Sequence, residues 1–145
     1  MKLKELTFDN LRYTFKEING GKIVNFTLGN EMLEFQSPRI LVKEVTETHL
    51  TFELLNNKAC DIFKNKITTL ENVFEKKYQS LSKSIFTLNE FTVKNDKNTI
   101  VFHDDTIINT LKCGQIVICL FVFNKFWVKD LTLNYNLNIK EIKVT

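Results

Sequence analysis

The chain has 145 residues, of which 43% are hydrophobic and 26% charged, so it can bury one good core but is too short to divide into two. We therefore expect a single domain spanning residues 1–145. Its formal net charge of +3 permits binding to a polyanion, but it excludes a histone-like tail and a polybasic membrane anchor.

Cysteine usage and the apolar runs predict the cellular compartment. The three cysteines are an odd set without CxxC spacing, which argues against a secreted disulfide scaffold and against a zinc module. The start of the chain has no apolar segment typical of a signal peptide, and the longest apolar run, residues 116–123, is far shorter than the roughly 20 residues of a membrane helix. We expect a cytoplasmic protein that binds no membrane, no metal and no cofactor.

The part of the chain before residue 56 is predicted to be a series of strands. Turn signals stand at Asn19-Gly20-Gly21 and at Gly29-Asn30, because glycine and asparagine tolerate positive φ. Ser37-Pro38 should break the strand before it, since proline cannot donate a hydrogen bond to a neighbouring strand. The expected strands are residues 4–8, 11–15, 22–28, 32–36, 40–45 and 49–55.

A change of period predicts one long helix over residues 57–82. Apolar residues recur there at intervals of three and four, whereas the opposite side is rich in lysine and glutamate. Asn56 or Asn57 can cap this helix, and Asp61 in the first turn suits the positive end of the helix dipole. We expect the apolar stripe to pack on a sheet rather than to bind a cofactor or a membrane. The stripe consists of Phe63, Ile67, Leu70, Phe74, Tyr78 and Leu81.

Strands resume after the helix. Residues 114–123 contain an apolar run that covers both faces of a strand, so this element should lie at the centre of the sheet. A hairpin around Lys129-Asp130 should join the next two strands. The expected strands are residues 85–93, 99–103, 114–123, 126–128, 131–133 and 137–144. Strands on both sides of one helix favour a mainly β (α+β) fold, an OB-fold-like β-barrel of five or more strands with one long amphipathic helix between the two strand groups.

Residues suited to catalysis are sparse. His49 and His103 lie far apart, and no GxSxG, HExxH, P-loop or GxGxxG motif accompanies them. His103-Asp104-Asp105 is the best candidate for metal-assisted phosphoryl chemistry, but adjacent carboxylates on one strand point to opposite faces, which favours a solvated turn. Cys119 lies in the most apolar strand and should be an inert core thiol. We expect no enzymatic activity.

Residues suited to nucleic-acid binding gather near the C-terminal hairpin. Binding a single strand requires cations for the phosphates and exposed rings on which unpaired bases stack. Strand alternation places Phe126 and Trp127 on opposite faces, so one of these two rings should face outward. Phe52, Phe121 and Phe123 should lie in the core. The candidate binding residues are Lys125, Phe126, Trp127, Lys129, Tyr135 and Lys140, together with Phe35, Arg39 and Lys43 near the Pro38 bend.

Two segments follow an order of elements found in a known family. One segment, residues 114–144, contains Phe126-Trp127-Val128-Lys129, then Leu131-Thr132-Leu133, then an alternating strand. The other is Phe35-Gln36-Ser37-Pro38, followed by two strands and a helix. In these segments the chain resembles OB-fold single-stranded-DNA-binding proteins of large cytoplasmic DNA viruses and of yeast cytoplasmic linear plasmids. It departs from them in the final hairpin, where those proteins usually carry glycine and this chain has Asn134-Tyr135.

The resemblance implies a replication factor that coats displaced single strands with little base specificity, by aromatic stacking and lysine–phosphate contacts. The implied partner is single-stranded DNA, with RNA, replication proteins and self-association as open alternatives. Abundant Lys, Asn, Ile and Phe, with Arg12 and Arg39 as the only arginines, is typical of AT-rich coding DNA and indicates a viral or plasmid genome. The competing interpretation is a non-enzymatic structural or protein-interaction module that uses a sheet edge and a Phe-rich surface.

Overall fold

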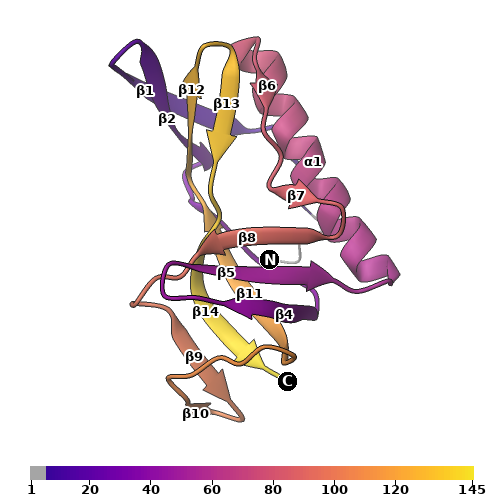
Figure 1. Ribbon diagram of the computed structural model, residues 1–145. Coiled ribbons are helices and arrows are strands. Elements are labelled where there is room, and N and C mark those ends of the chain that lie inside the picture. The colour runs from indigo at the N-terminus through magenta and orange to yellow at the C-terminus, as the bar shows by residue number, and fades with distance from the viewer. Residues whose placement is uncertain (1–5) are drawn as a thin grey trace.

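A computed structural model describes residues 6–145, and within them the backbone forms fourteen strands and one helix (Figure 1). The mainly β class with a single helix, expected from the sequence, is confirmed. The elements are β1 (Leu11–Ile18), β2 (Gly21–Leu28), β3 (Leu33–Gln36), β4 (Ile40–Val45), β5 (His49–Leu54), α1 (Lys58–Tyr78), β6 (Leu81–Ser82), β7 (Phe86–Thr87), β8 (Glu90–Lys94), β9 (Ile100–His103), β10 (Thr106–Ile107), β11 (Ile116–Phe123), β12 (Lys125–Lys129), β13 (Thr132–Tyr135) and β14 (Asn138–Val144).

The strands form two sheets. A five-stranded sheet has the order β1-β2-β12-β13-β6, and a nine-stranded sheet has the order β10-β9-β14-β11-β4-β5-β8-β7, with β3 also paired to β11. Within residues 6–145 neither strand order returns to its first strand, so the closed OB-like barrel expected from the sequence is not confirmed. As Figure 1 shows, the β12–β13 hairpin extends from β11 and β14, so the same two stretches of chain run through both sheets.

The strand break at Ser37-Pro38, expected from the sequence, is confirmed, and it lies alongside β11. The two strands on either side of it, β3 and β4, both pair with this one strand: β3 with residues 120–123 and β4 with residues 116 and 117. Between them the Ser37 hydroxyl accepts a hydrogen bond from the Cys119 N–H at 2.9 Å, and the Ser37 N–H donates to the Cys119 carbonyl at 2.8 Å. Ser37 therefore keeps the buried backbone of β11 satisfied where proline interrupts the ladder.

The helix begins where the sequence predicts and ends earlier. The Asn57 side chain caps it by accepting a hydrogen bond from the Cys60 N–H at 2.8 Å, and Asp61 lies in the first turn. The last helical residue is Tyr78, because Gln79 adopts the left-handed conformation with a φ of 47°. Leu81, expected on the helical stripe, instead begins β6 and is exposed.

The core is unusually rich in phenylalanine. Nine of the thirteen phenylalanines are fully buried, and only Phe15 is largely exposed, so the excess of rings serves packing. Phe63, in the first half of α1, contacts Phe121 of the nine-stranded sheet, with ring centroids 6.2 Å apart. Phe74, in the second half of α1, stacks on Phe126 of the five-stranded sheet at 4.3 Å. One helix face therefore packs on both sheets.

Three other segments differ from the sequence prediction. Residues 85–93 form two short strands rather than one, because Leu88 takes a positive φ of 57° and turns the chain. In β14 an extra residue, Lys140, at the Leu120/Phe121 register shift moves the buried position after Ile139 from 141 to 142, as expected for a β-bulge. Residues 6–8 are not a strand, and the remainder of the strand predicted at residues 4–8 lies outside the described residues.

A buried carboxylate links the helix to the five-stranded sheet. Glu71 on α1 is buried, and its Oε1 accepts hydrogen bonds from the Tyr135 hydroxyl at 2.5 Å and the Ser84 hydroxyl at 3.1 Å. Burial, together with the hydrogen bond to Glu71, raises the pKa of Tyr135 far above its ordinary value of 10.0. Tyr135 therefore stays a neutral hydrogen-bond donor while the protein is folded.

We expect Tyr135→Phe to lower the free energy of unfolding by about 1.5–3 kcal/mol at pH 7, because the buried Glu71 carboxylate loses a donor. A raised folded pKa means that the stability contributed by the Tyr135 phenol is present below pH 10 and is lost as the pH rises further, when the unfolded chain ionises. The difference between wild type and variant should therefore narrow above pH 10. Urea unfolding at neutral and alkaline pH measures this difference.

Tyr78→Phe is the matched control, because within residues 6–145 the Tyr78 hydroxyl makes no side-chain hydrogen bond. It should cost less than about 0.5 kcal/mol at pH 7. Equal losses in the two variants would show that the Glu71 contact contributes nothing specific.

Candidate nucleic-acid interface

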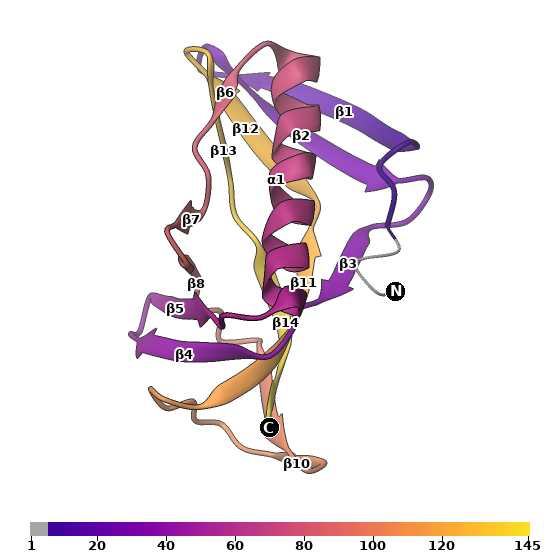
Figure 2. The same ribbon diagram turned by 90° about the vertical axis from the view of Figure 1, so that its right-hand side faces the viewer.

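The five-stranded sheet has one face covered by α1 and one face open. Tyr13 of β1, Phe26 of β2 and Phe126 of β12 all contact Phe74 on the helix, so these positions face inward. Figure 2 shows α1 in front of this sheet. Because side chains alternate along a strand, the intervening residues form the opposite surface, here called the outer face. The outer face comprises Arg12, Thr14, Lys16, Ile18, Gly21, Ile23, Asn25, Thr27, Lys125, Trp127, Lys129, Thr132 and Asn134.

The strand register places an aromatic ring among cations on this face. Trp127 of β12 lies opposite Ile23 of β2, and Ile23 lies opposite Lys16 of β1. Lys125 and Lys129 stand two residues away from Trp127 on the same strand and therefore on the same face. Trp127 is 37% exposed, which leaves part of its ring open to solvent.

The charge of the outer face has one sign. It carries four cations, Arg12 with the three lysines, and none of its thirteen residues is acidic. Within residues 6–145, none of these four cations lies within 4.0 Å of a carboxylate, since the ion pairs there involve other residues. The face is therefore positively charged although the net charge of the whole chain is only +3.

Two shallow pockets open on the outer face. One of about 230 Å³ lies beside Trp127 and is also lined by Ile18, Ile23 and Lys129. Gly21 also lines it, and an added Cβ there would stand 2.8 Å from the backbone oxygen of Val128, so the close approach of β2 to β12 requires glycine. The second pocket, of about 330 Å³, is lined mainly by polar residues, among them Arg12, Thr14, Asn25, Thr27 and Asn30.

Three of the predicted site residues come together on this face: Lys125, Trp127 and Lys129. The outer-face residues of the β1–β2 hairpin, among them Arg12 and Lys16, were missed. Alternation within residues 11–28 could have identified them as one face of a hairpin. However, the sequence contains no signal that β2 pairs with β12, so their proximity to Trp127 was not predictable.

The other three predicted rings are not available to a base. Phe126 is fully buried against Phe74, because it occupies the inward position of β12. Tyr135 lies directly opposite Phe126 in the ladder, is buried on the same face and stacks on Phe123 at 4.7 Å. Phe35 is buried in the nine-stranded sheet against Phe121. The prediction that one of Phe126 and Trp127 faces outward is confirmed, with Trp127 as the outward residue.

The remaining predicted cations lie elsewhere and mostly have partners. Lys43 on β4 is paired with Glu90, and Lys140 on β14 lies 3.6 Å from Glu34. Arg39 is exposed immediately before β4. All three belong to the nine-stranded sheet or its edge, so they do not extend the positive charge of the outer face.

The tripeptide His103-Asp104-Asp105, considered above as a metal site, forms the turn between β9 and β10. Asp104 and Asp105 both have positive φ, 48° and 64°, and both are exposed, as the solvated-turn interpretation requires. Within residues 6–145, no three His, Cys, Asp or Glu side chains are grouped closely enough to hold a metal ion. Cys119 is a buried free thiol whose pKa is raised by desolvation, as expected for an inert core residue.

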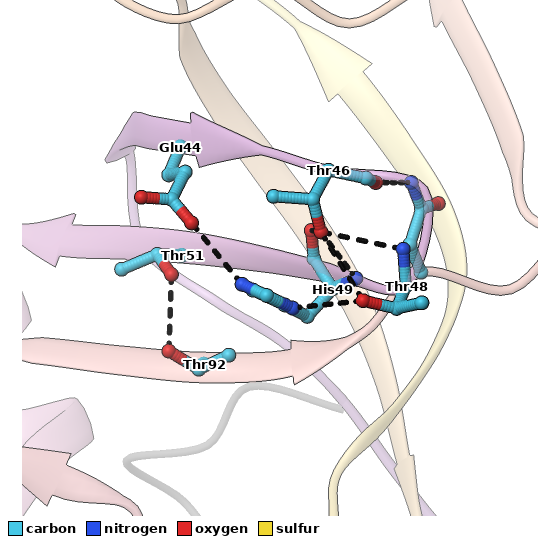
Figure 3. A network of polar contacts seen from close by, with 7 residues as sticks. Glu44, Thr46, Thr48, His49, Thr51 and Thr92 are labelled. Atoms are coloured by element: carbon cyan, nitrogen blue, oxygen red, sulfur yellow. Dashed lines mark hydrogen bonds and ion pairs between the residues drawn. The ribbon is translucent and has the colours of Figure 1, made fainter.

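A polar network at the β4–β5 turn contains the other histidine (Figure 3). His49 Nε2 lies 3.1 Å from the Glu44 carboxylate, and His49 Nδ1 lies 3.0 Å from the Thr48 hydroxyl, an order that resembles a nucleophile, base and orienting acid. Yet the Thr46 hydroxyl accepts hydrogen bonds from the N–H groups of Thr48 and His49, which is how a threonine stabilises a tight turn. The His49 and Glu44 side chains are 40% and 58% exposed. We therefore interpret the network as a turn-forming one.

Within residues 6–145, no helix is long and apolar enough to span a bilayer. No protein-family model matches the chain, and no curated protein matches it.

Proposed function

We propose that the protein binds single-stranded DNA on its outer face with little preference for sequence. One observation carries this proposal: a partly exposed Trp127 lies between Lys125 and Lys129, on a sheet face that has four cations and no acidic residue. The lysines neutralise phosphates, and the indole ring stacks on an unpaired base. Duplex DNA buries its bases in its own stack, so it uses only the cations and binds more weakly.

The proposed role is that of a coating protein in the replication of a viral or linear-plasmid genome in the cytoplasm. Stacking accepts any base, so such a protein covers displaced strands regardless of sequence. A distant relation to OB-fold single-stranded-DNA-binding proteins is part of this proposal. It is supported by the one helix between two groups of strands and by the tryptophan on the β12–β13 hairpin. The turn of that hairpin is Asp130-Leu131, and Asn134-Tyr135, noted as the departure from that family, lies in β13.

A protein-interaction module is the second candidate, favoured by the edge strand β1. This eight-residue strand pairs only with β2 among the described strands, and Phe15 on it is 56% exposed. Unpaired strand edges accept strands from other chains. Retention on a single-stranded-DNA column, followed by elution with salt, supports DNA binding; passage through the column supports the interaction module.

We expect Trp127→Ala to weaken binding to single-stranded oligonucleotides by about 1–3 kcal/mol, because one stacking platform is lost. Trp127 is the only tryptophan, so its fluorescence should be quenched on binding and reports the contact directly. Fluorescence titration of the wild type, and anisotropy of a labelled oligonucleotide for the variant, measure these effects. An RNA of the same sequence, titrated in parallel, decides between DNA and RNA.

Two controls accompany Trp127→Ala. Trp127→Phe keeps a ring and should retain most of the affinity. Leu88→Ala removes an exposed apolar side chain from the turn between β7 and β8, at the nine-stranded sheet, and should leave binding unchanged. Equal affinity of the wild type for single and double strands, or unchanged binding by Trp127→Ala, would contradict the stacking contact.

The salt dependence should separate the outer-face lysines from the paired ones. For single strands, the slope of log K against log salt is about −0.7 per phosphate neutralised, so the double variant Lys125→Gln/Lys129→Gln should flatten the slope by about 1.4. The control Lys43→Gln/Lys140→Gln has the same change in charge, but these lysines lie beside Glu90 and Glu34. It should leave the slope close to that of the wild type. Equal flattening by both double variants would assign binding to overall charge rather than to the outer face.

A further inference from the structure

We propose that the bound strand continues from Trp127 across β2 to a second contact at Arg12, where the pocket between β1, β2 and the Gly29-Asn30 turn receives a phosphate of the same strand. This inference rests on the proposed binding of single-stranded DNA. It adds a phosphate subsite and the path that the bound nucleic acid takes over the sheet. The Trp127 contact alone determines neither of these.

The Arg12 side chain is held in place without being neutralised. One guanidinium nitrogen, Nη1, donates to the Asn30 Oδ1 at 2.7 Å, and an amide oxygen carries no charge. Within residues 6–145, Arg12 has no ion pair, so its positive charge and its other N–H donors remain for a ligand. Because the side chain is already oriented, binding a phosphate costs less conformational entropy than ordering a free arginine.

The loop that presents Asn30 is itself fixed by hydrogen bonds. Gly29 has a φ of 64°, its N–H donates to the Asn10 carbonyl at 2.7 Å, and its own carbonyl accepts from the Thr27 hydroxyl at 2.8 Å. The acidic residue next to Asn30 in the sequence is Glu31. It forms a backbone β-bridge with Leu28, which is one of the inward-facing positions of β2. Apart from Phe26 and Gly29, the pocket is lined by an arginine, two asparagine amides and two threonine hydroxyls, which are the groups that contact phosphate and sugar in nucleic-acid complexes.

The spacing between the two contacts suits a short stretch of single strand. Trp127 of β12 pairs with Ile23 of β2, which pairs with Lys16 of β1, so Lys16 lies level with Trp127 and two strands away. Arg12 lies four residues before Lys16 on β1. At about 4.8 Å per strand and 3.4 Å per residue, Arg12 and Trp127 are about 17 Å apart. That separation equals about five nucleotides stacked at 3.4 Å, and fewer when the strand is extended. The row containing Asn25 and Lys125 lies between the two contacts and marks the path.

The experiment compares a thymidine dinucleotide, which reaches only Trp127, with a thymidine octanucleotide, which reaches both contacts. Tryptophan fluorescence gives both affinities. Arg12→Gln should weaken binding of the octanucleotide about tenfold, the loss of one charge-assisted contact, and leave the dinucleotide within about twofold. Arg39→Gln is the matched control, because it removes the only other arginine, which lies at the nine-stranded sheet. It should change neither affinity.

Asn30→Ala is the second variant, which keeps the charge but removes the amide that holds Arg12. It should give a smaller loss with the same dependence on length, and urea unfolding confirms that each variant folds. Equal loss for both oligonucleotides, or no loss for the octanucleotide, would overturn the Arg12 subsite while leaving the Trp127 contact in place. Failure of the wild type to bind either oligonucleotide would overturn the subsite together with the proposed function.

Discussion

The contact of one helix with two sheets is the interaction on which the rest of the structure depends. Phe63 and Phe74 lie three turns apart on one face of α1. Phe63 packs against Phe121 of the nine-stranded sheet, whereas Phe74 packs against Phe126 of the five-stranded sheet and against Phe123 of β11. A fully buried phenylalanine contributes about 1.5–3 kcal/mol relative to an exposed one, so the buried rings around the helix are a large part of the stability. Because α1 packs on both sheets, it also holds them in a constant relative position.

The helix covers the inner face of the five-stranded sheet and leaves the outer face open to solvent. This asymmetry gives the protein a surface that carries only positive charges. The acids that could neutralise it lie elsewhere, and two of them, Glu90 and Glu34, pair with lysines of the nine-stranded sheet. A chain with a net charge of only +3 can attract a polyanion when its cations are grouped in this way. The same alternation of side chains along β12 that buries Phe126 turns Trp127 outward. This one strand therefore supplies a ring to the core and a ring to the candidate interface.

Much of the local structure could be predicted from residue patterns. The turn at Asn19-Gly20, the strand break at Ser37-Pro38 and the cap at Asn57 depend on the conformational preferences of the residues themselves. The early end of α1 and the division of residues 85–93 were missed, because Gln79 and Leu88 take positive φ, which side chains of their type rarely adopt. Backbone hydrogen bonds accompany both conformations: the Gln79 N–H donates to the Glu75 carbonyl at the end of α1, and β7 pairs with β8 on either side of the turn at Leu88.

By itself, the sequence determined that the chain is mainly β with one helix, which residues line the helical stripe as far as Tyr78, and that only one of Phe126 and Trp127 can face outward. Those properties follow from periods of two and 3.6 residues, which are local. Tertiary structure alone decided that β2 pairs with β12, which brings Arg12 and Lys16 to the face of Trp127, and that Tyr135 and Phe35 are buried. Strand pairing joins residues about a hundred positions apart, and nothing within either segment specifies its partner, since the choice depends on how the whole core packs around α1.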